Sequence, residues 1–349
     1  MRELTEKENS LLLKLQQGIP LVAHPYAILG KTLDMSESEV LGCIEKCFSF
    51  GKARRMGGVF DARRLGYRSM LCAVDLLPDA VEKLTPVLIA HPGITHCYER
   101  SWPAELQETL DGGPVGREHV PNIWFTLAVN HDDFDADIAK LSVALAPYDI
   151  LQLPALRRFK IDVIFDPRQR KLGEEFPGML RGADSKSIPE KFPLFSEREK
   201  AIVRILDNNM PRVSNPYEAI ATEVGVSLKE LLATLNGWKD SGILRRMAMI
   251  VYHHQLGFKA NGMCVWHVDA DRVDECGRML ASCSAVTHCY RRPYTQTFPY
   301  DLYAMIHDQS WDKVYQLFLD ISKKTGLVNG RFLCSTREFK KTSMSYFIS

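Results

Sequence analysis

The sequence predicts an α+β fold made by tandem duplication, in which each copy is a winged helix-turn-helix followed by a ferredoxin-like βαββαβ module. Two observations predict this fold. Short motifs recur at a nearly constant spacing along the chain, and in each copy three amphipathic helices precede an alternation of strands and helices. The chain has 349 residues, 46% of them apolar, which is enough for a core in each copy.

The duplication is seen in motifs that share one spacing. GKARRM at 51–56 returns as GILRRM at 242–247, and THCYER at 95–100 returns as THCYRR at 287–292. RRFK at 157–160 returns as REFK at 337–340, at a shorter spacing. The first copy therefore carries an extra loop, and residues 105–120 have the Gly- and Pro-rich composition of one.

Breaks in composition predict five segments. Residues 167–193 are polar, punctuated by Pro and Gly and without periodicity, which is typical of a linker. The predicted domains are a winged helix-turn-helix at 1–62, a βαββαβ module at 63–166, the linker at 167–193, a second winged helix-turn-helix at 194–253 and a second βαββαβ module at 254–349.

The helix-turn-helix elements follow from helix start and stop signals. Thr5 with Glu8, and Ser196 with Glu199, are capping boxes that open the first helix of each copy. A second helix is predicted after Pro25 and after Pro216, and a third over 36–51 and over 227–242, each ending at a glycine. The Arg-Arg-Met stretches then form the wing strands.

The module elements follow from alternating apolar runs and helical periodicity. In the first copy the sequence predicts strands at 67–76, 94–102, 123–130 and 151–161, with helices at 78–90 and 133–145. In the second copy it predicts strands at 258–268, 285–293, 300–307 and 328–339, with helices at 270–281 and 311–323.

Composition and charge exclude several classes of protein. Lys and Arg number 44 against 43 Asp and Glu, a net charge of +1, which argues against a nucleic-acid coating protein. The predicted recognition helix at 36–51 holds three glutamates and one lysine, so DNA binding is not expected. No apolar run reaches the ~18 residues of a membrane span. Nine scattered cysteines without an export signal predict reduced thiols in the cytoplasm.

The recurring THCY strands carry the candidate site. Because side chains alternate along a strand, the His, Tyr and Arg of each motif share one face, and the intervening Cys points to the other. These two triplets are His96, Tyr98 and Arg100 in the first copy, and His288, Tyr290 and Arg292 in the second. Ferredoxin-like sheets leave one face free of helices, so two such faces can meet and form a cleft. The alternative is a polar interface in which the His and Tyr side chains bond to each other.

Two resemblances follow from these motifs. The helix-turn-helix, the LGY at 65–67 and the βαββαβ module together resemble the Lrp/AsnC transcription regulators. THCYER, THCYRRPY at 287–294 and FPYDLYAMIH at 298–307 resemble the sirohaem decarboxylases. That resemblance implies two paired halves, forming a pseudo-dimer that could oligomerise further. It also implies removal of two ring acetate carboxyls from sirohaem, giving didecarboxysirohaem for haem d1 or haem biosynthesis. No added cofactor is expected, because the iron is part of the substrate.

Site roles are assigned by chemistry. Histidine is the usual proton donor near neutral pH, so His288 and His96 are the expected acids, with Tyr290 and Tyr98 beside them. Either histidine could instead ligate the sirohaem iron, and no separate metal site is expected. Arginine suits a carboxylate-rich macrocycle, and aromatic and histidine side chains line such a cleft. The substrate-binding candidates are Arg54, Arg55, Arg100, Arg245, Arg246, Arg291, Arg292, His254, Tyr294, Tyr300 and His307.

The second copy is richer in proton donors, so the expected site is a single cleft lined mostly by the C-terminal half. Two other functions remain open on the sequence. One is an Lrp/AsnC-type regulator that senses a small ligand or haem, which would need a basic recognition helix and no His-Cys-Tyr triplets. The other is a tetrapyrrole carrier without turnover, which would keep the arginines and tolerate loss of His288.

Overall fold

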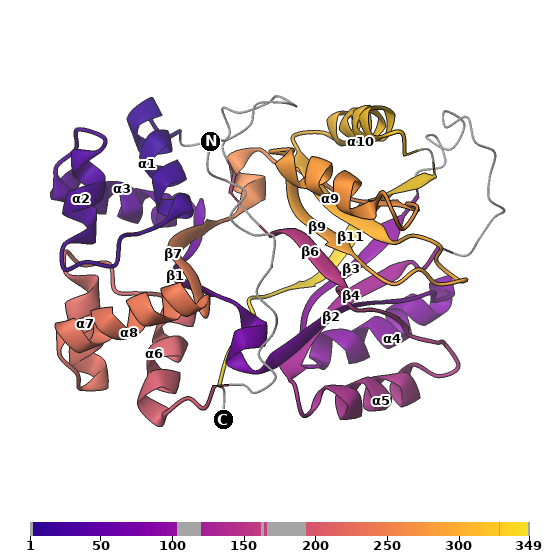
Figure 1. The fold of residues 1–349 in the computed structure, drawn as a ribbon, viewed down its shortest axis with the longest axis horizontal. Coiled ribbons are helices and arrows are strands. Elements are labelled where there is room, and N and C mark those ends of the chain that lie inside the picture. Colours follow the sequence, from indigo (N-terminus) through magenta and orange to yellow (C-terminus); the bar gives the residue numbers. More distant parts are fainter. Residues whose placement is uncertain (1–2, 103–119, 162–163, 166–192, 328, 348–349) are drawn as a thin grey trace.

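The computed structural model describes residues 3–102, 120–161, 164–165, 193–327 and 329–347. The two helix-turn-helix units lie side by side at one end of the molecule and the two βαββαβ modules lie at the other (Figure 1). The predicted linker at 167–193 and the predicted loop at 105–120 fall outside the described residues, except for Pro193 and Val120.

The helix-turn-helix helices begin where the sequence predicts. Their capping boxes are all formed, at Thr5, Ser36, Ser196 and Ser227, each with a Glu three residues later. The helices are α1 Glu6–Gln17, α2 Pro25–Lys31 and α3 Glu37–Ser49 in the first copy, and α6 Glu197–Asn208, α7 Pro216–Val224 and α8 Leu228–Ser241 in the second.

The two wings pair with each other. Strand β1 (Ala53–Phe60) lies antiparallel to β7 (Leu244–Val251), and short 3-10 turns, η1 (Ala62–Leu65) and η3 (His253–Leu256), follow them. A Cβ added at Gly57 would lie 2.0 Å from the carbonyl oxygen of Leu206 in α6, so the first copy's wing packs directly on the second copy's helix. Both helix-turn-helix units consequently share one apolar core.

Within the described residues, nine strands from both copies form one sheet in the order β5-β2-β4-β3-β11-β8-β10-β9-β6. The first copy supplies β2 Tyr67–Val74, β3 Ile94–Ser101, β4 Ile123–Asn130, β5 Leu151–Leu153 and β6 Arg157–Ile161; the second supplies β8 Ala260–Trp266, β9 Val286–Arg291, β10 Leu302–Asp308 and β11 Gly330–Lys341. The predicted strands are confirmed to within a few residues at their ends, with one exception.

The exception is the strand predicted at 151–161, which is divided into β5 and β6 by Pro154. Proline has no N–H to give to a ladder, and the second copy has Cys334 in the corresponding place, where β11 continues unbroken. β5 pairs with β2 of its own copy, whereas β6 pairs with β9 of the other copy. β11 does the same in one piece, pairing with β8 and then with β3.

The end of the last strand of each copy therefore pairs with a strand of the other copy, which is called strand exchange below. Only residues 154–156 separate the two edge strands β5 and β6, so the sheet curls until its edges are neighbours. Helices cover the outer face: α4 (Pro78–Ala90) and α5 (Phe134–Leu145) in the first copy, α9 (Val273–Ser282) and α10 (Trp311–Thr325) in the second (Figure 1).

The two helix-free faces meet inside the curled sheet, as the sequence predicts. Their centre is filled by apolar and aromatic side chains of both copies rather than left open, and the rings of Trp124 and Phe298 lie 5.2 Å apart. All nine cysteines fall within the described residues and are buried and unpaired.

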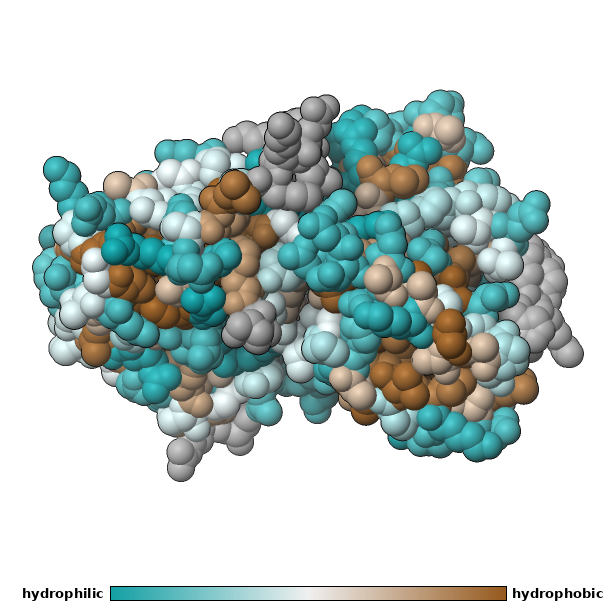
Figure 2. Space-filling model, turned by 90° about the horizontal axis from the view of Figure 1, so that it is seen from below, coloured by the Kyte–Doolittle hydropathy of each residue, from teal (hydrophilic) through white to brown (hydrophobic). Residues whose placement is uncertain are grey.

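The outer surface mixes the two kinds of side chain, and hydrophobic patches stand among hydrophilic ones on the face in Figure 2. Among the described residues, no helix has both the length and the apolar composition needed to cross a bilayer.

Strand exchange can be tested at Gly277, where α9 of the second copy meets Phe159 of β6. A Cβ at Gly277 would lie 2.4 Å from that ring. We expect Gly277→Ala to lower the free energy of unfolding by about 1–3 kcal/mol in urea denaturation, because the added methyl has no space.

Phe159→Leu in the same chain should restore part of the loss. The control is Gly237→Ala in α8, where nothing lies within 4 Å of the added Cβ, and stability should rise slightly. Equal effects of the two Gly→Ala changes would contradict the predicted clash between α9 and β6.

Candidate active site

The two triplets have matching geometry. In the first copy the rings of His96 and Tyr98 are 6.2 Å apart, and the Arg100 guanidinium lies 5.1 Å from the Tyr98 ring centroid. In the second copy the rings of His288 and Tyr290 are 6.3 Å apart, and Arg292 lies 4.8 Å from the Tyr290 centroid. The alternation inferred from the sequence thus places imidazole, phenol and guanidinium in one row in each half.

A β-bulge precedes each triplet histidine. Thr95 and His96 together face Thr126 alone, and Thr287 is the extra residue of the second bulge. The bulge brings each threonine hydroxyl to Nδ1 of the following histidine, at 2.9 Å in the first copy and 3.0 Å in the second. Nε2 is then the ring nitrogen on the side away from the threonine.

The triplet histidines are neutral at pH 7 in this structure. Burial lowers the pKa of His288 to about 4, and the nearby cations Arg245 and Arg292 add to the effect. Burial lowers the pKa of His96 to about 4 as well, with Lys341 and Arg54 contributing. Both imidazoles therefore lie in surroundings with an excess of positive charge.

Arg100 and Arg292 are buried beside the phenols. Arg100 is 5% exposed, and in the part of the chain that the structure describes its Nε and Nη1 have no hydrogen-bond partner. Burial lowers the pKa of Arg100 to about 10, so it keeps its charge at neutral pH. Arg292 is 8% exposed and donates one hydrogen bond to the carbonyl of Leu153. A buried guanidinium with unmet donors is suited to an incoming carboxylate.

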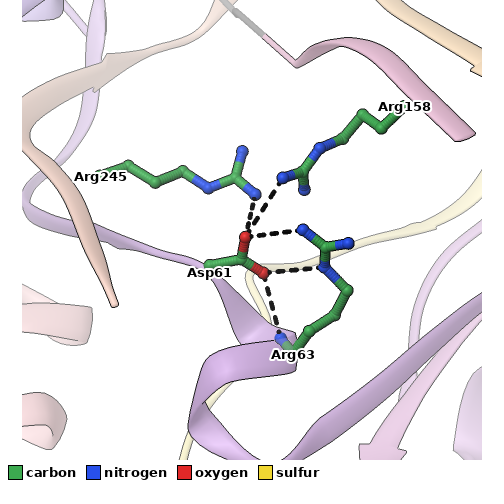
Figure 3. A network of polar contacts seen from close by, with 4 residues as sticks. All are labelled: Asp61, Arg63, Arg158 and Arg245. Atoms are coloured by element: carbon green, nitrogen blue, oxygen red, sulfur yellow. Dashed lines mark hydrogen bonds and ion pairs between the residues drawn. The ribbon is translucent and has the colours of Figure 1, made fainter. Parts of the chain in front are cut away.

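A second group of guanidiniums gathers on Asp61, at the end of the first wing (Figure 3). Arg245 Nη2 lies 2.8 Å from Asp61 Oδ2, Arg158 Nη2 lies 3.2 Å from the same oxygen, and Arg63 binds both carboxylate oxygens, at 3.1 and 2.9 Å. Burial alone would raise the pKa of Asp61, but the hydrogen bonds of Arg63 and the charges of all three arginines hold it well below its usual range.

The His96 half has different neighbours. Lys341 lies opposite His96 in the strand register and Glu338 lies opposite Tyr98. Lys341 Nζ is 3.4 Å from Nδ1 of His253, whose ring stacks on Phe165 with 5.5 Å between centroids. Burial, followed by the charge of Lys341, lowers the pKa of His253 to about 3.

Several candidates predicted from the sequence lie near the triplets. Arg54 and Arg245 act on the pKa values of His96 and His288 respectively. His307 Nδ1 is 3.2 Å from the hydroxyl of Thr287, and the ring of the exposed His254 lies against that of His253, tilted by 38° with 4.0 Å between ring centroids.

Other predicted candidates lie elsewhere. Arg55 points to the opposite face of the wing from Arg54, toward Asp207 of α6 at 3.9 Å, and strand alternation likewise separates Arg246 from Arg245 and Arg291 from Arg292. Tyr294 is 53% exposed and packs on His267, and Tyr300 is part of the central apolar cluster.

Sequence reasoning missed Asp61, Arg63, Arg158, Lys341 and Glu338 as site residues. Asp61 and Arg63 stand just before LGY, in a wing motif that signalled fold rather than chemistry. The other three come to the site only because the last strands are exchanged between copies. Among the described residues, no group of three or more His, Cys, Asp or Glu side chains could hold a metal ion.

Family models match most of the chain. The AsnC-like ligand binding domain matches residues 64–160 and 255–340, and the siroheme decarboxylase NirDL-like HTH domain matches residues 8–48 and 199–245. Both models match twice, once in each copy.

Curated relatives match either the whole chain or about half of it. A "Siroheme decarboxylase" of Hydrogenobacter thermophilus is 34% identical over 97% of this chain and 94% of its own length. A "Siroheme decarboxylase beta subunit" of Oleidesulfovibrio alaskensis is 38% identical over 44% of this chain and 98% of its own length, so that relative corresponds to one half.

Two solved structures of the siroheme decarboxylase NirDL resemble nearly the whole of this chain. The crystal structure of the siroheme decarboxylase NirDL in complex with an iron-uroporphyrin III analogue superposes with a TM-score of 0.69 and 30% identity, covering 98% of this chain and 95% of that one. A second crystal structure of the siroheme decarboxylase NirDL superposes on this chain with a TM-score of 0.71.

The buried histidines predict a pH dependence of stability. A histidine whose pKa is lower in the folded than in the unfolded chain contributes stability above its unfolded pKa of about 6.5, and that stability is lost as the pH falls. We expect the free energy of unfolding in urea to decrease between pH 6.5 and about 4, the pKa of His288 and His96.

His288→Gln should reduce that decrease by at least about 1 kcal/mol. The control is His131→Gln, since the His131 side chain is 52% exposed and should leave the pH dependence unchanged. A His288→Gln profile parallel to that of the unmodified chain would show that His288 is not a buried neutral imidazole.

Proposed function

The chain belongs to the sirohaem decarboxylase family, and on this basis we propose that it removes the carboxyl groups of two pyrrole-ring acetate side chains of sirohaem. It is then a carboxy-lyase whose product is didecarboxysirohaem, used for haem d1 or for haem. We propose that the two Lrp/AsnC-like halves act together as a pseudo-dimer within one chain, and the AsnC-like model that matches each half supports this.

The observation that carries this proposal is the pair of buried guanidiniums, Arg100 and Arg292, each beside a phenol and four residues along the strand from the histidine of its triplet. A charged group of this kind is costly to bury without an anion. Sirohaem brings carboxylates on flexible side chains around a flat ring, and we propose that these pair with the two guanidiniums, whose Nε atoms have no hydrogen-bond partner among the described residues.

The reaction needs a proton and a place for electrons. The pyrrole ring accepts the electron pair of the breaking C–C bond once the ring is cationic, carbon dioxide leaves, and the exocyclic methylene takes up one proton to become a methyl group. We assign that proton delivery to His288 and His96, with Tyr290 and Tyr98 orienting the side chain. Burial raises the pKa of Tyr290 and Tyr98, so both phenols remain hydrogen-bond donors.

Proton donation by the histidines requires higher pKa values than they have in the free protein, and substrate binding provides this change. The histidines are neutral in the absence of substrate because of burial and surrounding cations. Substrate carboxylates offset those cations and raise the histidine pKa values toward neutrality, where an imidazolium is an efficient acid. We propose that no added cofactor is needed, since the ring itself is the electron acceptor.

The regulator function is not favoured. Helix α3 begins with Glu37 and Glu39, which would face phosphate unfavourably, and the model that matches both helix-turn-helix units is the siroheme decarboxylase NirDL-like HTH domain. The nine buried, unpaired thiols support a reducing compartment, the cytoplasm.

Turnover of sirohaem is the direct test. Purified protein incubated anaerobically with sirohaem, without added cofactor, should yield products that have lost one and then two carboxyl groups, as measured by mass spectrometry. A macrocycle that binds but returns unchanged would support the carrier function instead and refute the proposed activity.

The acid is tested by His288→Ala. Because general acids contribute about 10²–10⁴-fold, we expect the rate of decarboxylation to fall by at least about 10²-fold with a much smaller loss of sirohaem affinity. His131→Ala, on an exposed histidine, is the matched control and should keep full activity. Full turnover by His288→Ala would remove His288 from the acid role while leaving the family assignment intact.

A further inference from the structure

The two halves of the site differ at matched positions. Arg158 lies opposite Tyr290 in the strand register, and Glu338 lies opposite Tyr98. These positions correspond in the two copies, since RRFK and REFK are the same motif. A cation beside one triplet is thus replaced by a carboxylate beside the other.

The wing residues differ in the same way. Counting back from the LGY motif and its counterpart LGF, Tyr252 stands where the first copy has Asp61, and His254 stands where it has Arg63. In the part of the chain that the structure describes, the ion cluster of Figure 3 therefore lies on the side of His288 and Tyr290 and has no counterpart beside His96 and Tyr98. The charges of Arg158, Arg245 and Arg63 all bear on the environment of Tyr290.

The cluster has more donors than its own carboxylate can use. Each guanidinium offers five N–H donors, whereas one carboxylate accepts about four hydrogen bonds. Three guanidiniums share this one carboxylate in a region where the Asp61, Arg158 and Arg245 side chains are only 6%, 10% and 22% exposed. Such a group is complementary to further carboxylates.

Asp61 joins parts of the molecule that are distant in sequence. Arg63 belongs to η1, Arg158 to β6 and Arg245 to β7 of the second wing. Without a central anion the three like charges would repel one another and take up different orientations. The carboxylate therefore fixes the direction in which the remaining donors point.

We propose that Asp61 is a positioning residue that holds Arg63, Arg158 and Arg245 as a carboxylate-binding site beside Tyr290, and that the Arg158/Glu338 difference makes the macrocycle bind in one orientation. This rests on the proposed function, because sirohaem provides the carboxylates. Fixed orientation brings one particular acetate to His288, so a single monodecarboxylated isomer is formed first.

The first test is Asp61→Asn in the full chain. Charge alone predicts tighter binding of an anionic ring when a carboxylate is removed, whereas loss of positioning predicts weaker binding. We expect the Kd for iron-uroporphyrin III, measured by absorbance titration, to rise about tenfold, with a parallel rise in KM for sirohaem and a smaller change in kcat.

Unchanged or tighter binding by Asp61→Asn would overturn the positioning role. Thermal unfolding checks that the variant is folded, and Arg63→Gln offers a second way to weaken the cluster if it is not. Arg157→Gln is the matched control, because Arg157 is the neighbour of Arg158 on β6 but pairs with Asp274 on the outer surface. Its binding should match that of the unmodified chain.

The second test exchanges the charges, with Arg158→Glu and Glu338→Arg in one chain. We expect the first monodecarboxylated product, isolated at low conversion and identified by NMR, to change to the other isomer. Arg158→Gln alone should give both isomers. The same single isomer from these variants and the unmodified chain would overturn the orientation role.

The two proposals can fail separately. If the unmodified chain does not decarboxylate sirohaem, the proposed function fails. If it does so and the charge variants keep its affinity and isomer, only the roles of Asp61 and Arg158 fail.

Discussion

The exchange of the last strands between the two copies is the constraint on which the rest of the structure depends. β6 of the first copy completes the sheet of the second, and β11 completes that of the first, so neither module has a finished sheet alone. The same exchange brings Arg158 beside Tyr290 and Glu338 beside Tyr98. Each triplet consequently has a charged residue of the other copy beside it, so its surroundings depend on the pairing of the two copies.

The sequence predicted the local architecture well, because its signals are local. Capping boxes, such as that at Thr5, and the alternation around His288 depend only on nearby residues, and both were confirmed. The pairing between copies has no such signal. That Arg55 would face α6 and not the site follows from which surfaces meet, which motif spacing does not report. The break at Pro154 was a local signal that the prediction of one strand over 151–161 did not use.

The electrostatics of the site are arranged for a ligand that is itself charged. Burial favours the neutral imidazoles and protonated phenols, whereas unneutralised guanidiniums are costly to bury, and an entering anionic ring would lower that cost. Arg100 illustrates this, since it is charged, buried and short of acceptors. The folded protein thus holds buried positive charge without enough acceptors, and an anionic ligand would neutralise that charge.

The divergence of Arg158 and Glu338 also bears on why the two copies share one polypeptide. In an assembly of identical subunits the same residue would stand beside both tyrosines, so both sides would carry a cation or both a carboxylate. Joining two gene copies frees each to accumulate its own substitutions while their stoichiometry stays fixed at one to one. Separate subunits that each match one half of this chain achieve the same independence, but must find each other by diffusion after synthesis.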